Sequence, residues 1–166
     1  MLIAMASSHA SAQDAGLPGK SFSAVRTDAV PVIDGRLDDA PWKRASVIDD
    51  MHEIRPEDSR EPSEKTRFYV IYGDDDMYVG AKFEDSEPDR MVARVMRLGD
   101  YSMGDDALRI ILDPFNAGRS GYIFQLNPNG IRSDGLFRNV TEPYWEWEGI
   151  WQAAALQTET GWVAEM

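Results

Sequence analysis

The chain has 166 residues, of which 29 are acidic and 17 basic, and its formal net charge at pH 7 is -12. The length suits one domain, and so negative a surface repels phosphate backbones, which argues against nucleic-acid binding. The chain has no cysteine and only two histidines, so disulfides, thiolate metal sites and cysteine nucleophiles are excluded. No apolar run approaches the roughly 18 residues that a transmembrane helix needs.

The first residues, MLIAMASSHASAQ, are typical of the second half of a secretory signal. An apolar stretch at residues 2–6 precedes the small-x-small sequence Ala10-Ser11-Ala12, which predicts cleavage after Ala12. A basic first region is missing, so a disordered Ala/Ser tail stays an alternative interpretation. In either case we expect residues 1–20 to lie outside the folded domain.

Alternation of apolar and polar residues, the pattern of β-strands, dominates the rest of the chain. Its most regular example is the pair of segments 66–72 and 77–84, which flank a Gly-Asp-Asp-Asp turn and predict a β-hairpin. Before this hairpin, Asp34-Gly35 predicts a turn and residues 38–42 predict one or two helical turns. Further strand patterns stand at 21–26, 30–33, 47–54, 107–113, 122–126, 131–137, 147–158 and from 162 onward.

Residues 88–98 predict a short helix, because a proline and an acidic residue open the segment. The many short strands and their Gly, Asn and Asp turns predict an all-β fold. We expect one β-sandwich over residues 21–166, jelly-roll-like and of immunoglobulin-like size, with one or two short helices. The last strand pattern stops abruptly at Met166, so we expect the natural protein to continue and this sandwich to be C-terminally truncated.

Four segments, in the same order along the chain, resemble family 9 carbohydrate-binding modules. They are the DG turn with its acidic stretch at 31–42, the hairpin at 66–85, and the strands at 105–113 and 161–165. Residues 121–132 and 147–151 are similar to a subgroup of bacterial surface proteins. In that subgroup the module precedes a large region of unknown function that is thought to resemble an outer-membrane barrel.

The resemblance implies a non-catalytic β-sandwich that binds a poly- or oligosaccharide, in an envelope protein linked to polysaccharide breakdown or uptake. It also implies the periplasm or outer membrane of a Gram-negative bacterium, and a C-terminal barrel-like region as partner. Sugar-binding members clamp a sugar ring between two Trp side chains. The first clamp position falls on Met103 here, with Tyr101 nearby, and the second falls beyond Met166.

Candidate ligand-binding residues combine rings that could stack on a sugar with polar groups that could bond its hydroxyls. Packing is an equally good interpretation of the two aromatic residues that follow Pro143. Trp147 and Trp151 stand two strand periods apart and are expected to face the core. The predicted ligand-binding residues are Tyr101, Met103, Asp105, Asp106, Arg119, Tyr144 and Trp145.

The residues identify no cofactor, and two kinds stay open. Calcium could be held by carboxylate oxygens at 74–76 or at 105–106, although the first cluster lacks EF-hand spacing and is more simply a solvated hairpin tip. Haem is the other, because related sandwiches of the DOMON type bind it through Met or Lys. Met96 and Met103 are the candidate haem ligands of that type.

Two other function classes also stay open. On a strand, Glu146 and Glu148 would have Cα atoms about 6.6 Å apart on one face, near the carboxyl separation of inverting glycosidases. An ordinary solvated face is the simpler interpretation of these two residues. Alternatively, the domain could be a structural accessory that caps a barrel and has no affinity for sugar.

Overall fold

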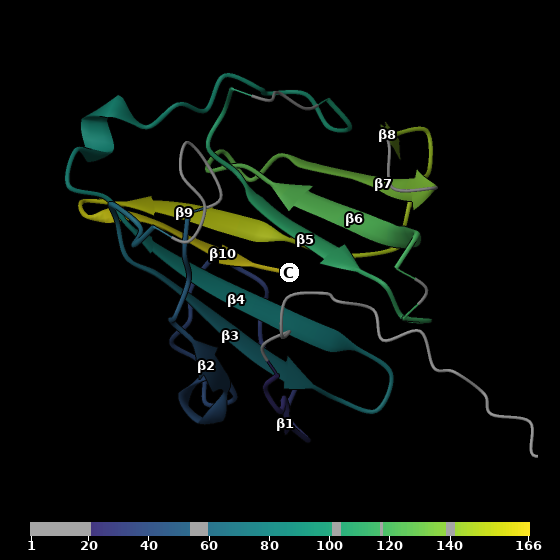
Figure 1. Cartoon of the computed structure of the whole chain (residues 1–166). Coiled ribbons are helices and arrows are strands. Elements are labelled where there is room, and N and C mark those ends of the chain that lie inside the picture. The colour runs from purple at the N-terminus through teal and green to yellow at the C-terminus, as the bar shows by residue number, and fades with distance from the viewer. Residues whose placement is uncertain (1–20, 54–59, 101–103, 117, 139–141) are drawn as a thin grey trace, which may run out of the picture.

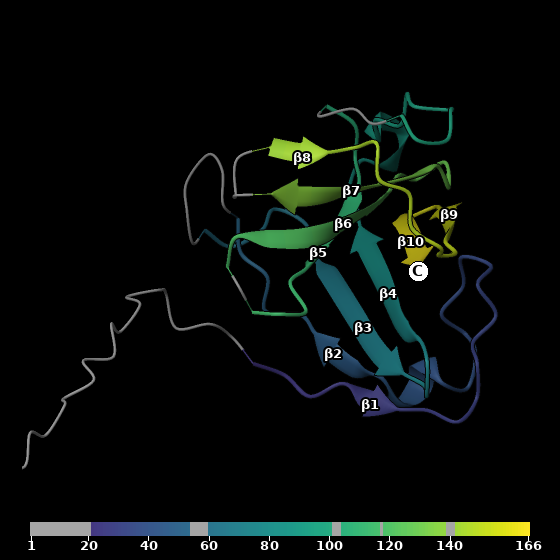
Figure 2. The ribbon, with the colours of Figure 1, turned by 90° about the vertical axis from the view of Figure 1, so that its right-hand side faces the viewer.

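The computed structural model describes residues 21–53, 60–100, 104–116, 118–138 and 142–166. Two β-sheets face each other as separate layers, which confirms the predicted all-β sandwich (Figures 1 and 2). Within these ranges the helical elements are two single 3-10 turns, η1 (Trp42–Arg44) and η2 (Pro88–Arg90). None of the described helical turns has the length and apolar character needed to cross a bilayer.

The larger sheet has six strands built around the predicted hairpin, β3 (Thr66–Tyr72) and β4 (Met77–Glu84). Beyond β4 lie β10 (Gly161–Glu165) and then β9 (Ala154–Thr158), both antiparallel to their neighbours. On the other side of the hairpin, β3 pairs with two short strands. One is β1 (Val25–Arg26), which is parallel to β3, and the other is β2 (Ser46–Ile48), which is antiparallel to it.

The smaller sheet has four antiparallel strands in chain order. They are β5 (Leu108–Leu112), β6 (Ser120–Leu126), β7 (Arg132–Arg138) and β8 (Glu142–Tyr144). A tight turn joins β6 to β7, where the Gly130 N–H donates to the Asn127 carbonyl at 2.9 Å. Gly130 has a φ of 76°, a conformation that glycine adopts without steric cost.

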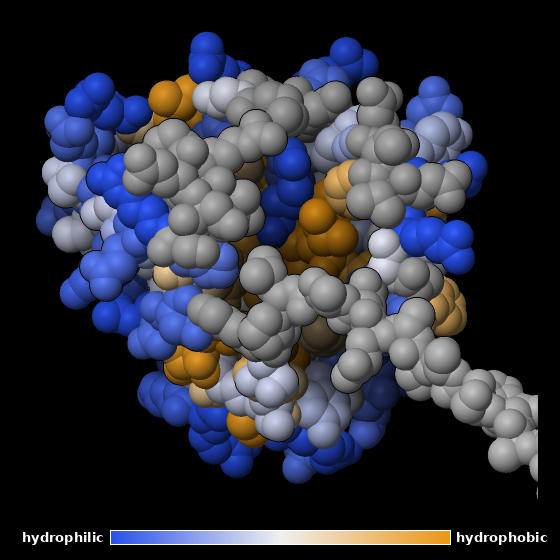
Figure 3. All heavy atoms as spheres, in the orientation of Figure 1, coloured by the Kyte–Doolittle hydropathy of each residue, from blue (hydrophilic) through white to orange (hydrophobic). Residues whose placement is uncertain are grey.

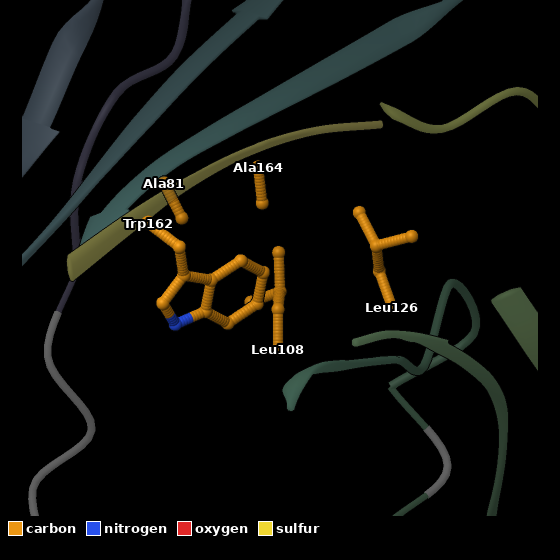
Figure 4. Close-up of a cluster of buried hydrophobic side chains, with 5 residues drawn as sticks. All are labelled: Ala81, Leu108, Leu126, Trp162 and Ala164. Atoms are coloured by element: carbon orange, nitrogen blue, oxygen red, sulfur yellow. The ribbon is translucent and has the colours of Figure 1, made fainter. Parts of the chain in front are cut away.

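The main core lies between the sheets (Figure 4). Leu108 and Leu126 of the smaller sheet pack against Trp162, Ala81 and Ala164 of the larger one, and all five are at most 5% exposed. The small alanine side chains leave room for the indole of Trp162. Burying each large side chain of this kind stabilises the fold by about 1.5–3 kcal/mol, so this cluster is what holds the two sheets together.

A second, smaller core lies on the other face of the larger sheet, where the covering segment, residues 27–45 between β1 and β2, lies over it. Trp42, Ile71 and Tyr78 are buried there, with Leu37 packed against them. A Cβ on Gly80 would come within 2.4 Å of a Leu37 methyl carbon and 3.3 Å of the Trp42 ring. Glycine at this point of β4 therefore lets the covering segment lie directly on the sheet.

Three predicted elements are wrong. Residues 88–98 form only η2, because backbone N–H groups farther along the segment bond carboxylates outside it. Residues 30–33 belong to no strand, since the turn that follows is anchored to the outer face of the larger sheet. The strand predicted over 147–158 begins only at Ala154. The strand predicted over 47–54 is the shorter β2, and the predicted tail at 1–20 lies outside the described residues.

Candidate functional site

A cleft of about 550 Å³ opens at one end of the sandwich, beside Met166, the residue that follows β10. Its walls are the first residues of β4, the inward faces of β5 and β6, the segment 150–152, and residues 30–33 of the covering segment. Apolar side chains gather in a recess near the middle of the face drawn in Figure 3, close to the C label of Figure 1. The cleft is thus apolar inside and bordered by polar surface.

Aromatic side chains form the floor of the cleft. Phe124 of β6 points inward and meets Trp151 edge to face, with ring centroids 5.2 Å apart. The Arg132 guanidinium lies 5.5 Å from the Trp151 ring centroid and also donates to the Trp151 carbonyl. These contacts fix the half-buried indole in one orientation. Its Nε1 atom is buried and has no hydrogen-bond partner among the described residues.

The rim of the cleft carries polar groups, and the charged ones among them are acidic. Asp75, Asp76 and Gln152 line it, and no basic side chain is among the described lining residues. Tyr78 is hydrogen-bonded to Asp76, and burial together with that carboxylate raises the pKa of the Tyr78 hydroxyl. The rim therefore offers carboxylate and amide groups to a ligand and repels anions.

Exposed apolar side chains stand beside these polar groups at the rim. Val30 is 75% exposed, Met77 46% and Ile150 fully so. Single exposed apolar residues are ordinary, but these three lie around one cleft and extend its apolar lining to the surface.

The structure places the two predicted platforms Tyr144 and Trp145 on opposite faces of the smaller sheet. Tyr144 pairs with Leu136, is 42% exposed, and lies 5.0 Å from the Arg138 guanidinium. Its hydroxyl donates to Glu146 at 2.8 Å, and this hydrogen bond raises the pKa of Tyr144. These two rings consequently do not form one platform.

Trp145 lies against the outer face of the smaller sheet. A Cβ on Gly135 would be 3.2 Å from the Trp145 ring, and the Arg109 guanidinium is 5.9 Å from the ring centroid. Arg109 in turn donates to the Gln125 side chain at 2.9 and 2.5 Å. This half-buried indole therefore packs as part of the outer face.

The predicted hydroxyl partners Asp105 and Asp106 hold the segment before β5. Oδ2 of Asp105 accepts from the backbone N–H groups of Arg94 and Val95 at 2.6 and 2.9 Å, and this side chain is 2% exposed. Asp106 accepts from the Val92 N–H at 2.7 Å. These oxygens are thus engaged within the chain.

The other predicted site residues lie apart from the cleft or outside the described residues. Arg119 is exposed just before β6. Met96, a candidate haem ligand, is 70% exposed, and its sulfur is 3.0 Å from the Asn129 amide nitrogen. Tyr101 and Met103 lie outside the described residues.

Two of the acidic arrangements that the sequence suggested, the cluster at 74–76 and the pair Glu146 and Glu148, do not have the geometry of the sites they were compared with. Asp74 pairs with Arg26 at 2.5 Å, and nowhere in the described ranges do three or more His, Asp or Glu side chains group to hold a metal ion. β8 ends at Tyr144, so Glu146 and Glu148 do not share the strand that their predicted spacing requires.

The cleft itself was not predicted from the sequence. Trp151 was expected in the core, and it does pack on Phe124, but it also lines the cleft. Asp75 and Asp76 were candidates only for calcium.

Comparison with known proteins identifies no relative, because no family model, curated protein or solved structure matches the chain.

Proposed function

We propose that this domain binds carbohydrate without breaking it down, as a module of an exported bacterial envelope protein. The observation that carries this proposal is the fixed Trp151 indole in a cleft that has an aromatic floor and a rim of carboxylate and amide groups. A poly- or oligosaccharide would place one sugar ring in this cleft.

A pyranose has the two kinds of surface that this cleft would complement. Its face of C–H groups packs on an aromatic ring, while its hydroxyls need hydrogen-bond partners. Trp151 and Phe124 would meet the first, and Asp75, Asp76 and Gln152 would bond the second. The cleft volume of about 550 Å³ falls within the range of small-molecule sites, about 300–1,000 Å³.

The positions of the carboxylates favour binding over hydrolysis. Glycosidases place two carboxyl groups on either side of the bond that they cleave. Asp75 and Asp76 are adjacent residues on one turn at the rim, so they would hold hydroxyls from one side only.

A second candidate function is supported by the exposed apolar rim at Val30, Met77 and Ile150. These side chains would suit a protein surface, such as the barrel-like region that the resemblance implies, with no affinity for sugar. This candidate predicts copurification of the two parts when they are expressed separately, and no binding of oligosaccharides.

The test is an affinity gel and calorimetric titration with cello-, xylo- and chito-oligosaccharides. We expect the wild type to bind at least one of them, Trp151→Ala to lose binding, and Trp145→Ala to keep it. The two substitutions are matched, because each removes a half-buried indole contacted by an arginine. If Trp145→Ala alone abolished binding, the cleft would be the wrong site, and if no glycan bound the wild type, the carbohydrate proposal would be refuted.

A further inference from the structure

A carboxylate buried under the covering segment gathers four hydrogen bonds. Oε2 of Glu165 accepts from three consecutive backbone N–H groups, those of Asp34, Gly35 and Arg36, at 2.9, 2.6 and 3.0 Å. Its Oε1 accepts from the Trp42 indole N–H at 2.7 Å. The Glu165 side chain is fully buried at the end of β10.

The turn at residues 34–36 is shaped to present those three N–H groups to one oxygen. Gly35 has a φ of 87°, and a Cβ there would lie 2.9 Å from the Ala155 carbonyl carbon. The turn is therefore pressed against β9 while its N–H groups converge on Glu165. Successive N–H groups arranged in this way form an anion-binding concavity, and leaving them unpaired in a buried place would be costly.

The same turn ends one wall of the cleft. Val30, Pro31 and Ile33 line the cleft and directly precede the turn, while Met166, which follows Glu165, lines it from the sheet. Within this wall, the Val32 N–H donates to Asp39 at 2.7 Å, but Asp39 belongs to the same covering segment.

Hydrogen bonds between described residues attach the wall to the larger sheet at its two ends. At the first end the Thr27 N–H donates to the Tyr72 carbonyl at 2.8 Å. At the second end Glu165 accepts from the turn. At this second end, the hydrogen bonds of the turn all converge on one side chain. Ile33, which directly precedes the turn, packs against the buried core of the outer face.

We propose that Glu165 is the positioning residue of the cleft: its carboxylate fixes the turn at 34–36 and thereby holds Val30, Pro31 and Ile33 in place as a wall. Glu165 does not touch the ligand. Its consequence for affinity rests on the proposed function, whereas its consequence for the wall can be measured on the protein alone.

The chain has no cysteine, so spin labels can be placed without further changes. Val32→Cys puts one label on the wall, where the side chain is 62% exposed, and Thr158→Cys puts the other on an exposed residue at the far end of β9. Pulsed electron resonance then gives the distribution of distances between the two labels. We expect a narrow distribution in the otherwise wild-type protein and one about two-fold broader with Glu165→Gln.

The control must separate positioning from a general loss of stability. Ile123 is fully buried on the outer face of the smaller sheet, so Ile123→Val or Ile123→Ala, whichever matches the melting temperature of Glu165→Gln, serves as that control. We expect the control to keep the narrow distribution. The proposal would be overturned if the distance distribution of Glu165→Gln were as narrow as that of the wild type. It would also be overturned if the distribution of the control were as broad as that of Glu165→Gln.

If Glu165→Gln does not fold, Gly35→Ala tests the same wall from its other side, because the added Cβ meets β9 and displaces the turn without altering Glu165. The same broadening is then expected, and its absence overturns the proposal. For a glycan that binds the wild type, we expect Glu165→Gln to weaken affinity about ten-fold beyond the matched control. A wild type that binds no glycan would refute the proposed function and leave the spin-label result to decide the role of Glu165.

Discussion

The hydrogen bond between Trp42 and Glu165 should make a measurable contribution to stability. The two side chains are 3% and 0% exposed, and the Nε1–Oε1 distance is 2.7 Å. Hydrogen bonds to charged groups contribute about 1.5–3 kcal/mol. We therefore expect a coupling free energy of about 1.5–3 kcal/mol between Trp42→Phe and Glu165→Gln in a double-mutant cycle.

Glutamine has nearly the shape of glutamate but cannot satisfy both sets of donors. If the amide oxygen points towards the turn at 34–36, the NH₂ group faces the Trp42 N–H. If the amide is turned over, the NH₂ group faces the three backbone N–H groups of the turn. Either way at least one buried donor stays unpaired, which costs about 1–3 kcal/mol. Glu165→Gln alone should therefore lower the free energy of unfolding by at least that amount.

The assay is urea denaturation at 25 °C, followed by far-UV circular dichroism, of the wild type, both single variants and the double variant. The cycle cancels the cavity that phenylalanine leaves at position 42, since that cavity is present with and without Glu165. A coupling free energy below about 0.5 kcal/mol would show that the two groups act independently and would refute the reasoning.

Three further outcomes are expected. Desolvation by burial raises the pKa of Glu165 against the opposing effect of its hydrogen bonds. The Glu165 carboxyl group therefore binds its proton more tightly in the folded state than in the unfolded chain. The stability that this contributes is fully present below the unfolded pKa near 4.5, and it is lost as pH rises through the higher pKa of the folded state. In denaturation series from about pH 4 to pH 7, the wild type should thus lose stability relative to Glu165→Gln, and a constant difference would contradict this. Gly161→Ala should lower the free energy of unfolding by more than about 3 kcal/mol, because φ is 129° and the new Cβ would lie 2.0 Å from the Phe83 carbonyl oxygen. Gly118→Ala, at φ 65° with open space around it, should cost only about 1 kcal/mol, and equal losses would count against the steric explanation. Asp105→Asn should speed hydrogen exchange at the Arg94 and Val95 amides, which bond Oδ2, while the exposed Asp89→Asn should leave their exchange unchanged.

Local patterns were enough to predict the strands at the centre of the fold. β3 and β4 follow one another, and the apolar alternation and the Gly-Asp-Asp-Asp turn that specify them lie within the same short stretch. The helix predicted at 88–98 failed for the opposite reason. Backbone N–H groups of that segment bond Asp105 and Asp106, ten to fourteen residues further along the chain, and no local pattern contains that information.

The cleft was harder to predict because it depends on contacts between distant residues. Alternation suggested that Trp151 faces inward, but not that the sandwich opens where this ring lies. Glu165 was visible as an acidic residue ending an alternating strand. Its partners in the turn at 34–36 are about 130 residues away, so only the folded structure identifies it as an anchor for the wall.

The proposal that the cleft binds carbohydrate is tested most directly by the indole N–H resonances of the protein. The chain has five tryptophans, so a ¹⁵N-labelled sample gives one signal for each during a titration with oligosaccharide. We expect the Trp151 signal to shift in a saturable way, and those of the buried Trp42 and Trp162 to stay in place. If cello-, xylo- and chito-oligosaccharides all left the Trp151 signal unmoved, or if only the Trp145 signal shifted, the cleft would not be the sugar site.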